Sequence, residues 1–242
     1  AKTIGTDVPK RGEHHEKDLA KGTARLYFNT FVTVLNEAVR EGIIPKNPTK
    51  LLKKEERKML SKQESKRCYL SIEEIKLLMV TPCKADTVKC AFLFACFCGL
   101  RLSDVRSLRW ADIGKGTEGY YISKQMVKSR HVVTIPLSEN ALAWMPARGQ
   151  ARVEDKVFSL PSYFSVNYRM KQWAREAGIE KPVTFHVSRH TFATTLLTMG
   201  VDLYTTSKLL GHQNIITTQV YAEIVNRKKV EAVHLLDQIK PL

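Results

Sequence analysis

The feature that most constrains the fold is an apolar run over residues 90–100, which reads Cys-Ala-Phe-Leu-Phe-Ala-Cys-Phe-Cys-Gly-Leu. This run is the longest in the chain, yet it falls well short of the roughly 18 apolar residues that a membrane-spanning helix needs. Residues 86–98 instead suit a core helix that ends near Gly99, because glycine readily terminates helices. We therefore expect a folded protein that does not cross a membrane.

The cysteines indicate a reducing compartment. The chain has five of them, and three (Cys90, Cys96 and Cys98) lie inside the apolar run, where buried reduced thiols are expected. No CxxC pair is present to begin a zinc site, and the N-terminus does not resemble a signal peptide. We expect a cytoplasmic protein that binds no metal.

The charge balance points to a polyanionic partner. The 242 residues include 39 Lys and Arg against 24 Asp and Glu, which gives a net charge of +15. With 43% hydrophobic residues, the composition is that of a folded protein and excludes disorder for most of the chain.

The N-terminal part predicts a helix and a linker. Residues 22–39 carry apolar side chains at three- and four-residue spacing, so we expect a helix that Thr23 caps and Gly42 ends. Residues 51–67 are rich in Lys, Arg and Glu and indicate a linker to a larger second part.

The larger part is predicted to be mostly helical with one small antiparallel sheet. Ser71 and Glu74 form a capping box at a helix start. The β-branched and aromatic segments 120–123 and 132–137 predict strands, joined by a basic turn over residues 124–131. Helical patterns return after the strands.

Three separated segments carry polar groups that helix packing does not require. In the first, Arg101 directly follows the apolar helix and its terminating glycine. An ion pair with Asp104, three residues later, is one explanation, and a functional arginine is the other.

The second segment places His186 and Arg189 three residues apart, on one face of a predicted helix start. An imidazole, a guanidinium fork and a helix N-terminus all favour a phosphate, although a single histidine is more often structural. In the third segment, Gly211 interrupts a helix before His212, and Tyr221 follows a short helical stretch. A tyrosine at such a position is commonly a core residue.

Taken together, these segments resemble the tyrosine recombinase (phage integrase) family in order, spacing and flanking residues. The matching stretches are GLRLSDVRSL with Arg101, HVSRHTFATTLL with His186 and Arg189, and LLGH with His212, followed nine residues later by Tyr221. The resemblance covers the chain from about residue 69 to its end. More loosely, residues 22–48 resemble the last helical part of that family's core-binding domain.

The resemblance implies a fold that is mainly α with a small antiparallel β-sheet, in two domains. Residues 1–64 would be a partial helical core-binding domain and linker, and residues 65–242 a mixed α/β catalytic domain. The family also places a lysine in its β-hairpin. Lys128 lies eight residues before Pro136, and this spacing favours it for the role over its competitor Lys124, although Arg130 replaces the usual glycine of the turn.

The family's activity is DNA strand cleavage and rejoining through a 3′-phosphotyrosyl intermediate, without a metal or cofactor. By resemblance, Arg101 and Arg189 clamp the non-bridging phosphate oxygens, and His212 adds a hydrogen bond. Tyr221 is the nucleophile, helped by His186 as base or by nearby cations, and Lys128 protonates the leaving oxygen. Asp104 orients Arg101. His190 is left outside this set as a packing or supporting residue.

The resemblance implies double-stranded DNA as the partner. The chain would bind it as a homotetramer at synapsis and would be a monomer when free of DNA. The resemblance also allows accessory DNA-bending proteins as partners. It favours integrases of phages or conjugative transposons, and it implies a bacterial protein associated with the nucleoid. Candidate DNA contacts are Lys21, Arg25, Arg106 and Arg130, and further Lys50, Lys53, Lys54 and Arg169.

Rival interpretations are a tyrosine-class type I topoisomerase, a DNA-binding module with vestigial catalytic residues, and an RNA-binding protein, for which no RNA-binding motif is present. We expect a truncated chain that lacks an arm-binding domain and the first core-binding helices. The amphipathic residues 225–242 would form a tail helix that packs on a neighbouring protomer or on its own core.

Overall fold

A computed structural model describes residues 21–53, 55–56 and 67–221. The chain separates into two compact units, Ala1–Lys66 and Arg67–Leu242, and each is described by itself. The domain boundary predicted between residues 64 and 65 and the tail helix predicted over residues 225–242 lie outside the described residues.

The first unit is built on one long helix, α1 (Lys21–Arg40), followed by the short 3-10 helix η1 (Pro48–Leu51). The chain reverses at Gly42, whose φ of +74° is readily available only to glycine. Asn47 then ties the returning segment to the helix, because its buried amide donates a 2.7 Å hydrogen bond to the side chain of Asn36.

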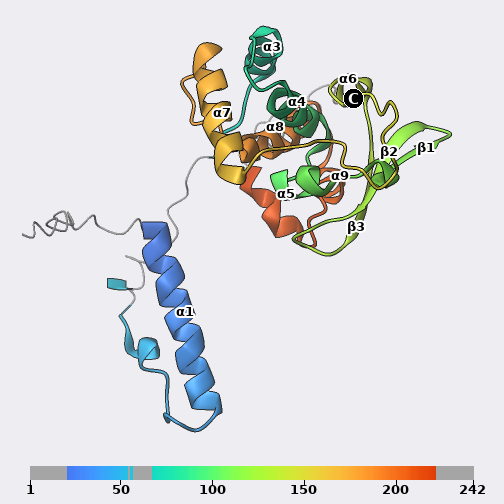
Figure 1. The fold of residues 1–242 in the computed structure, drawn as a ribbon. Coiled ribbons are helices and arrows are strands. Elements are labelled where there is room, and N and C mark those ends of the chain that lie inside the picture. The colour runs from blue at the N-terminus through green and yellow to red at the C-terminus, as the bar shows by residue number, and fades with distance from the viewer. Residues whose placement is uncertain (1–20, 54, 57–66, 222–242) are drawn as a thin grey trace, which may run out of the picture. The chain divides into compact units, whose positions relative to one another are not determined.

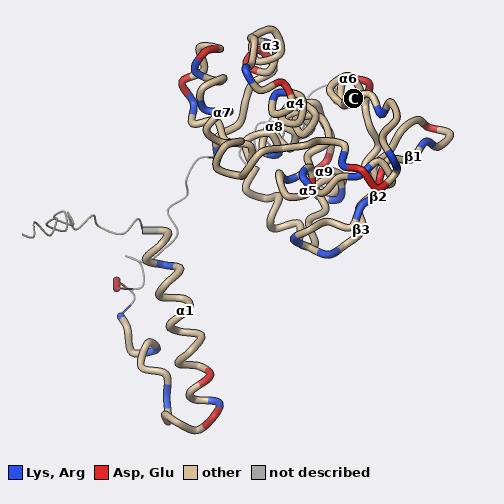
Figure 2. Tube along the Cα trace, viewed as in Figure 1, with Lys and Arg blue, Asp and Glu red and all other residues tan. Residues whose placement is uncertain are grey.

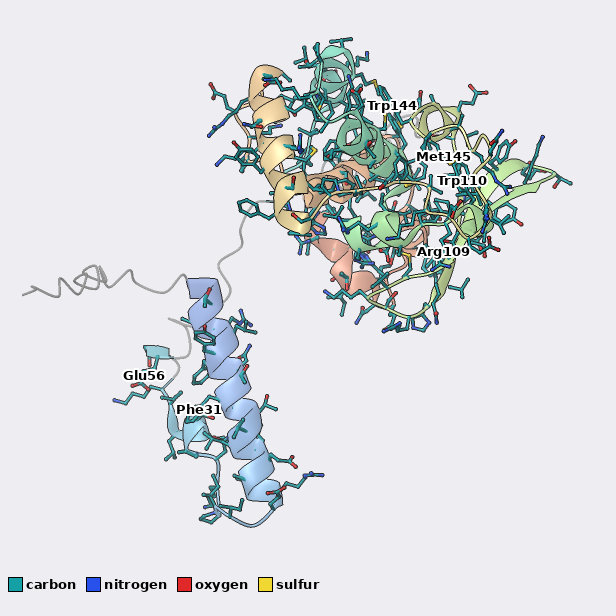
Figure 3. All side chains as sticks on the ribbon, in the orientation of Figure 1. Phe31, Glu56, Arg109, Trp110, Trp144 and Met145 are labelled. Atoms are coloured by element: carbon teal, nitrogen blue, oxygen red, sulfur yellow. The ribbon has the colours of Figure 1, made fainter. Side chains whose placement is uncertain are left out.

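The predicted helix is confirmed, but its predicted start is wrong. Thr23 lies inside α1, because the helix already includes Lys21, so Thr23 cannot be its N-cap. The apolar face of α1 is open to solvent in this unit. Figure 3 labels Phe31, which is 56% exposed, and Leu26 and Val34 are exposed to a similar extent.

The second unit is organised around α4 (Asp86–Cys98), which has the predicted bounds and ends at Gly99 with a φ of +71°. Figure 1 shows α4 and α8 (Phe185–Thr198) side by side, with α7 (Tyr163–Glu176) on one side and the sheet on the other. A Cβ on Gly99 would lie 2.5 Å from a ring carbon of Phe192 in α8, so the two segments approach closely only because this residue is glycine.

The cysteines match the prediction of reduced thiols. All five are unpaired, and Cys96 and Cys98 are buried while Cys90 is half-buried. Burial raises the pKa of the Cys98 thiol to about 12, so it stays protonated and inert at neutral pH.

The sheet has three antiparallel strands in the order β1 (Ile113–Gly116), β2 (Gly119–Gln125) and β3 (Val132–Pro136). Both predicted strands are confirmed. Lys124, however, was assigned to the turn and instead lies in β2, paired with Val133. Because side chains alternate along a strand, this register points Lys124 to the same buried face as Ile122.

The remaining helices complete the core. They are α3 (Ile72–Val80), which begins with the predicted capping box, α5 (Leu102–Ser107), η2 (Trp110–Asp112), α6 (Glu139–Ala143), α9 (Leu203–Leu209), η3 (Ile215–Thr217) and η4 (Gln219–Tyr221). Trp144 and Met145, labelled in Figure 3, follow α6 and pack against the main core. The predicted fold class, mainly α with a small antiparallel sheet, is confirmed. None of the helices in the described part of the chain is long and apolar enough to span a membrane.

Candidate active site

Three of the predicted catalytic residues line one groove of about 620 Å³ on the second unit. Arg101 stands at the N-cap of α5, directly after the turn at Gly99. His186 lies in the first turn of α8, and Lys128 lies on the turn between β2 and β3. Three separate elements therefore bring two cations and an imidazole to one concave surface, which Tyr163 also lines.

Asp104 joins the walls of this groove. Its carboxylate is fully buried, and Oδ1 accepts a 2.8 Å hydrogen bond from the backbone N–H of Val127, next to Lys128. Oδ2 lies 3.9 Å from Nη1 of Arg101, which is beyond hydrogen-bond length. Within the described residues, this buried Nη1 has no hydrogen-bond partner. Arg101 is therefore ion-paired with Asp104 and still has an N–H group, on Nη1, that no described residue accepts.

The two candidate lysines differ sharply in their surroundings. Lys124 is 8% exposed, and its Nζ donates 2.9 Å hydrogen bonds to the carbonyl of Ser107 and to the carboxylate of Asp112. Lys128 is exposed in the groove, and its ammonium makes no hydrogen bond or ion pair with the described residues. Only Lys128 therefore has its ammonium available to a ligand.

Arg189 is buried behind the groove and fixed at both ends of its guanidinium. Nη1 donates a 2.7 Å hydrogen bond to the carbonyl of Gly99, and Nη2 donates a 2.6 Å hydrogen bond to the carbonyl of Leu210. A guanidinium has five N–H donors, so these two bonds leave three for a ligand. Burial, and then the neighbouring charge of Arg101, lower the pKa of Arg189 to about 9, so it stays a cation at neutral pH.

His212 lies in the break after α9, where Gly211 takes a φ of +63°. Its Nδ1 shares a 2.8 Å hydrogen bond with the hydroxyl of Thr218, which fixes the ring. Burial, followed by the charges of Arg189 and Arg101, lowers the pKa of His212 to about 4. The ring is therefore neutral at pH 7, and both arginines lie within electrostatic reach of it.

Tyr221 closes η4 and is 6% exposed. Its hydroxyl lies 2.6 Å from Nδ1 of His190, the histidine that the sequence prediction left outside the reacting set. Burial raises the pKa of Tyr221, against the opposing effects of Arg67 and Arg189. The only sequence signal for His190 is its position one turn after His186, and nothing in that spacing reveals the partner from η4.

His186 does not contact Tyr221 through any hydrogen bond among the described residues. Its ring stacks edge-on against His190, with centroids 4.5 Å apart and planes at 80°. Burial, then the charges of Arg189 and Arg101, lower the pKa of His186. It therefore lines the groove and contacts His190, which in turn contacts Tyr221.

The predicted DNA contacts have mixed surroundings. Arg106 lines the groove and donates a hydrogen bond to the carbonyl of Pro161, and Arg130 is exposed on the β2–β3 turn, where Figure 2 shows basic residues. Arg169 is exposed on α7, and Arg25 is half-buried on α1. Lys50 and Lys53 are exposed in the first unit, and Lys54 and the side chain of Lys21 lie outside the described residues.

This arrangement has known counterparts. The profile described as the phage integrase family matches residues 68–227, which include every groove residue as well as Arg189, His190, His212 and Tyr221. The chain belongs to the phage integrase family. A second profile, the phage integrase SAM-like domain, matches residues 8–57. The family resemblance predicted from the sequence is therefore confirmed.

Named relatives of this phage integrase chain are tyrosine recombinases. XerD of Chlorobaculum tepidum is 32% identical over 188 residues, 68% of this chain and 60% of that protein. XerA of Thermococcus kodakarensis is 31% identical over 186 residues, 70% of this chain and 64% of that protein. A tyrosine recombinase of Pseudothermotoga lettingae is 33% identical over 147 residues, 59% of this chain. The chain spans about half of that last protein, 51% of its length.

Solved structures share the fold of this family member at low identity. A lambda integrase fragment, a dimer bound to a COC′ core site, superposes with a TM-score of 0.66 at 20% identity, covering 83% of this chain and 73% of that one. The Tn1549 transposon integrase in complex with a circular intermediate DNA gives 0.64 at 19% identity, covering 85% and 76%.

Proposed function

We propose that this chain is a site-specific DNA recombinase of the integrase type, which cleaves and rejoins strands through a 3′-phosphotyrosyl intermediate. The observation that carries the proposal is a buried tyrosine hydroxyl, Tyr221, in a cluster with a fixed guanidinium and next to a cationic groove. The printed names of the relatives and solved neighbours, tyrosine recombinases and integrases with DNA, agree with it.

The cations would stabilise the charge that develops on the phosphate. As the Tyr221 oxygen attacks, negative charge builds on the non-bridging oxygens, and preorganised donors in a site shielded from water stabilise it most. Arg101 brings a buried N–H donor that has no hydrogen-bond partner among the described residues, and Arg189 brings three further N–H groups. His212 would add a hydrogen bond from its free ring nitrogen, since Nδ1 is occupied by Thr218.

The leaving 5′ oxygen needs a proton, and Lys128 is the available donor. Lys128 is exposed in the groove that Arg101 also lines, whereas the ammonium of Lys124 is bound to Asp112 and Ser107. Asp104 would keep Arg101 and the turn that carries Lys128 at a constant separation, because it contacts both.

Double-stranded DNA is the proposed substrate, and a net charge of +15 suits it. We expect Arg106 and Arg130 to contact phosphates beside the groove, with Lys21 and Arg25 contributing from the first unit. A homotetramer at synapsis, a free monomer, and a cytoplasmic location at the nucleoid belong to the same proposal. Such an enzyme would integrate or excise a mobile element.

The proposal is tested by covalent trapping. The full chain and its Tyr221→Phe variant are incubated with nicked suicide duplexes from DNA that flanks the gene, with a chelator present, and resolved on a denaturing gel. We expect an adduct with the native chain and none with the variant. Arg189→Ala is expected to lower the rate of adduct formation about 10²- to 10³-fold, as loss of an oxyanion donor does.

Two outcomes would favour the rivals. If the chain binds these duplexes but forms no adduct, the DNA-binding module with vestigial residues is the better explanation. If an adduct forms, a joining assay with two duplexes of different length separates a recombinase, which exchanges the strands, from a type I topoisomerase, which only reseals its own substrate.

A further inference from the structure

We propose that His190, rather than His186, accepts the proton of the Tyr221 hydroxyl when the strand is cleaved. This inference rests on the proposed function and assigns one further catalytic residue to it. The observation behind it is the 2.6 Å separation of His190 Nδ1 and Tyr221 Oη, with both side chains at least nine-tenths buried.

The direction of this hydrogen bond follows from the two protonation states. Burial, and then the charge of His186, lower the pKa of His190 to about 3, so the ring is neutral at pH 7. Burial also raises the pKa of Tyr221, so the phenol keeps its proton. The hydroxyl therefore donates, and the Nδ1 lone pair of His190 accepts, so the one N–H proton of the neutral ring is on Nε2.

The groups that face His190 explain why it is not charged before DNA binds. They are His186 and Arg189 from its own helix, Tyr221 from η4, and Arg67 from the segment before α3. None of these groups carries a negative charge, so within the described residues no neighbour stabilises an imidazolium. A bound phosphodiester would bring negative charge to this cluster and favour protonation of His190 at the step that requires it.

The proposed step balances without any other reactant. The Tyr221 Oη–H bond breaks and its proton moves to His190 Nδ1, while the Oη–P bond forms. The bond from phosphorus to the 5′ oxygen breaks, and that oxygen takes a proton from Lys128. Rejoining reverses the sequence, with the proton on His190 returning to Tyr221.

His186 is the competing base, and the geometry argues against it. It lines the open groove with Arg101 and Lys128, its ring packs edge-on against His190, and among the described residues it makes no hydrogen bond to the phenol. Its position suits contact with the DNA phosphate. The two histidines therefore make different predictions for the pH dependence of cleavage.

The test measures single-turnover cleavage of the suicide duplexes over a range of pH with the full chain. Its variants are His190→Phe, which keeps the ring shape without nitrogen, His190→Asn, which keeps a polar atom near Nδ1, and the rival His186→Asn. His131→Asn, at an exposed position on the β2–β3 turn, is the control and is expected to keep the native profile.

Both His190 variants should cleave about 10²- to 10⁴-fold more slowly at neutral pH, the usual contribution of a general base. Their rates should then rise by about tenfold per pH unit in alkaline solution, because hydroxide replaces the missing base. A merely structural defect would not recover in this way. The inference is overturned if the His190 variants lose the same factor at every pH, or if alkaline recovery belongs to His186→Asn.

If the native chain forms no adduct with any duplex, the proposed function fails, and the His190 contact is judged separately. The Tyr221 phenol is then titrated in the DNA-free native chain and in His190→Phe by NMR of ring-labelled tyrosine. A changed titration of Tyr221 supports the contact on which the inference depends. An identical titration overturns it.

Discussion

Lys124 and Lys128 offer a test in which two lysines four residues apart should give opposite results. Among the described residues, removal of Lys124 leaves the carboxylate of Asp112, 22% exposed, with the backbone N–H of Arg109 as its one remaining partner. Breaking a buried ion pair costs about 3–5 kcal/mol, and the partial exposure of Asp112 places Lys124→Ala near the lower end, at about 3 kcal/mol. For a unit of this size, that lowers Tm by about 6 to 12 °C.

Lys128→Ala removes an ammonium that contacts no described partner, so its effect on stability should stay within about 0.5 kcal/mol. Its rate of DNA cleavage should fall about 10²- to 10⁴-fold, because no proton reaches the leaving oxygen. The assay therefore combines thermal unfolding with single-turnover cleavage of two duplexes, one ordinary and one with sulfur in place of the bridging 5′ oxygen. A thiolate leaves without protonation, so Lys128→Ala should regain a near-native rate on the sulfur duplex.

Lys124→Ala should unfold at lower temperature and show the same relative defect on both duplexes. The reasoning is refuted if sulfur restores cleavage by Lys124→Ala but not by Lys128→Ala. It is refuted equally if Lys128→Ala proves to be the destabilised variant.

Three further perturbations follow from the geometry. Gly99→Ala should destabilise the second unit by about 2–4 kcal/mol in urea unfolding, because it adds left-handed strain to a contact 2.5 Å from Phe192. Gly149→Ala, also at positive φ but with nothing within 4 Å, should cost only about 1–2 kcal/mol, and equal losses would contradict the packing argument. Arg130 has a φ of +60°, so Arg130→Gly should leave stability unchanged or raise it by about 1 kcal/mol. For DNA binding, the slope of log K against log salt should become smaller in magnitude by about 0.9. An unchanged slope would show that Arg130 does not contact the DNA. The pKa of His190 is lower in the folded chain than in the unfolded chain. Its contribution to the free energy of unfolding is therefore complete above about pH 6.5 and decreases as the pH falls toward 3. Between pH 7 and 5 this loss is about 2 kcal/mol, and urea unfolding of His190→Phe should lack that share of it.

Most of the fold could be predicted from the sequence, because local signals and burial agreed. The helix over residues 86–98 had an apolar run and a terminating glycine, and the two predicted strands, β2 and β3, contained β-branched and aromatic residues. Two predicted details were wrong because the sequence carried no information on the contacts that decide them. Thr23 has the chemistry of a cap but lies inside a helix that already includes Lys21, and Lys124 has the chemistry of a turn residue but is paired with Val133.

The site was predictable as a set of residue types but not as a set of contacts. The spacing placed His186 and Arg189 on one helix, yet it gave no indication that Arg189 would bond to two carbonyls from distant segments. It also gave no means of choosing which histidine meets Tyr221, because the choice depends on where η4 folds back against α8. Such long-range contacts follow from the packed core and leave no trace in sequence spacing.

The bonds from Arg189 to the carbonyls of Gly99 and Leu210 have a consequence for descendants of this protein. An arginine that joins the end of α4 and the end of α9 to α8 stabilises the fold, whether or not DNA is ever cut. Lys128 makes no hydrogen bond or ion pair with the described residues, so a lineage that no longer cleaves DNA could lose it without destabilising the fold. In related genomes, a domain that keeps the arginine but has lost the lysine and the tyrosine would mark a decayed enzyme, and the arginine by itself would say nothing about activity.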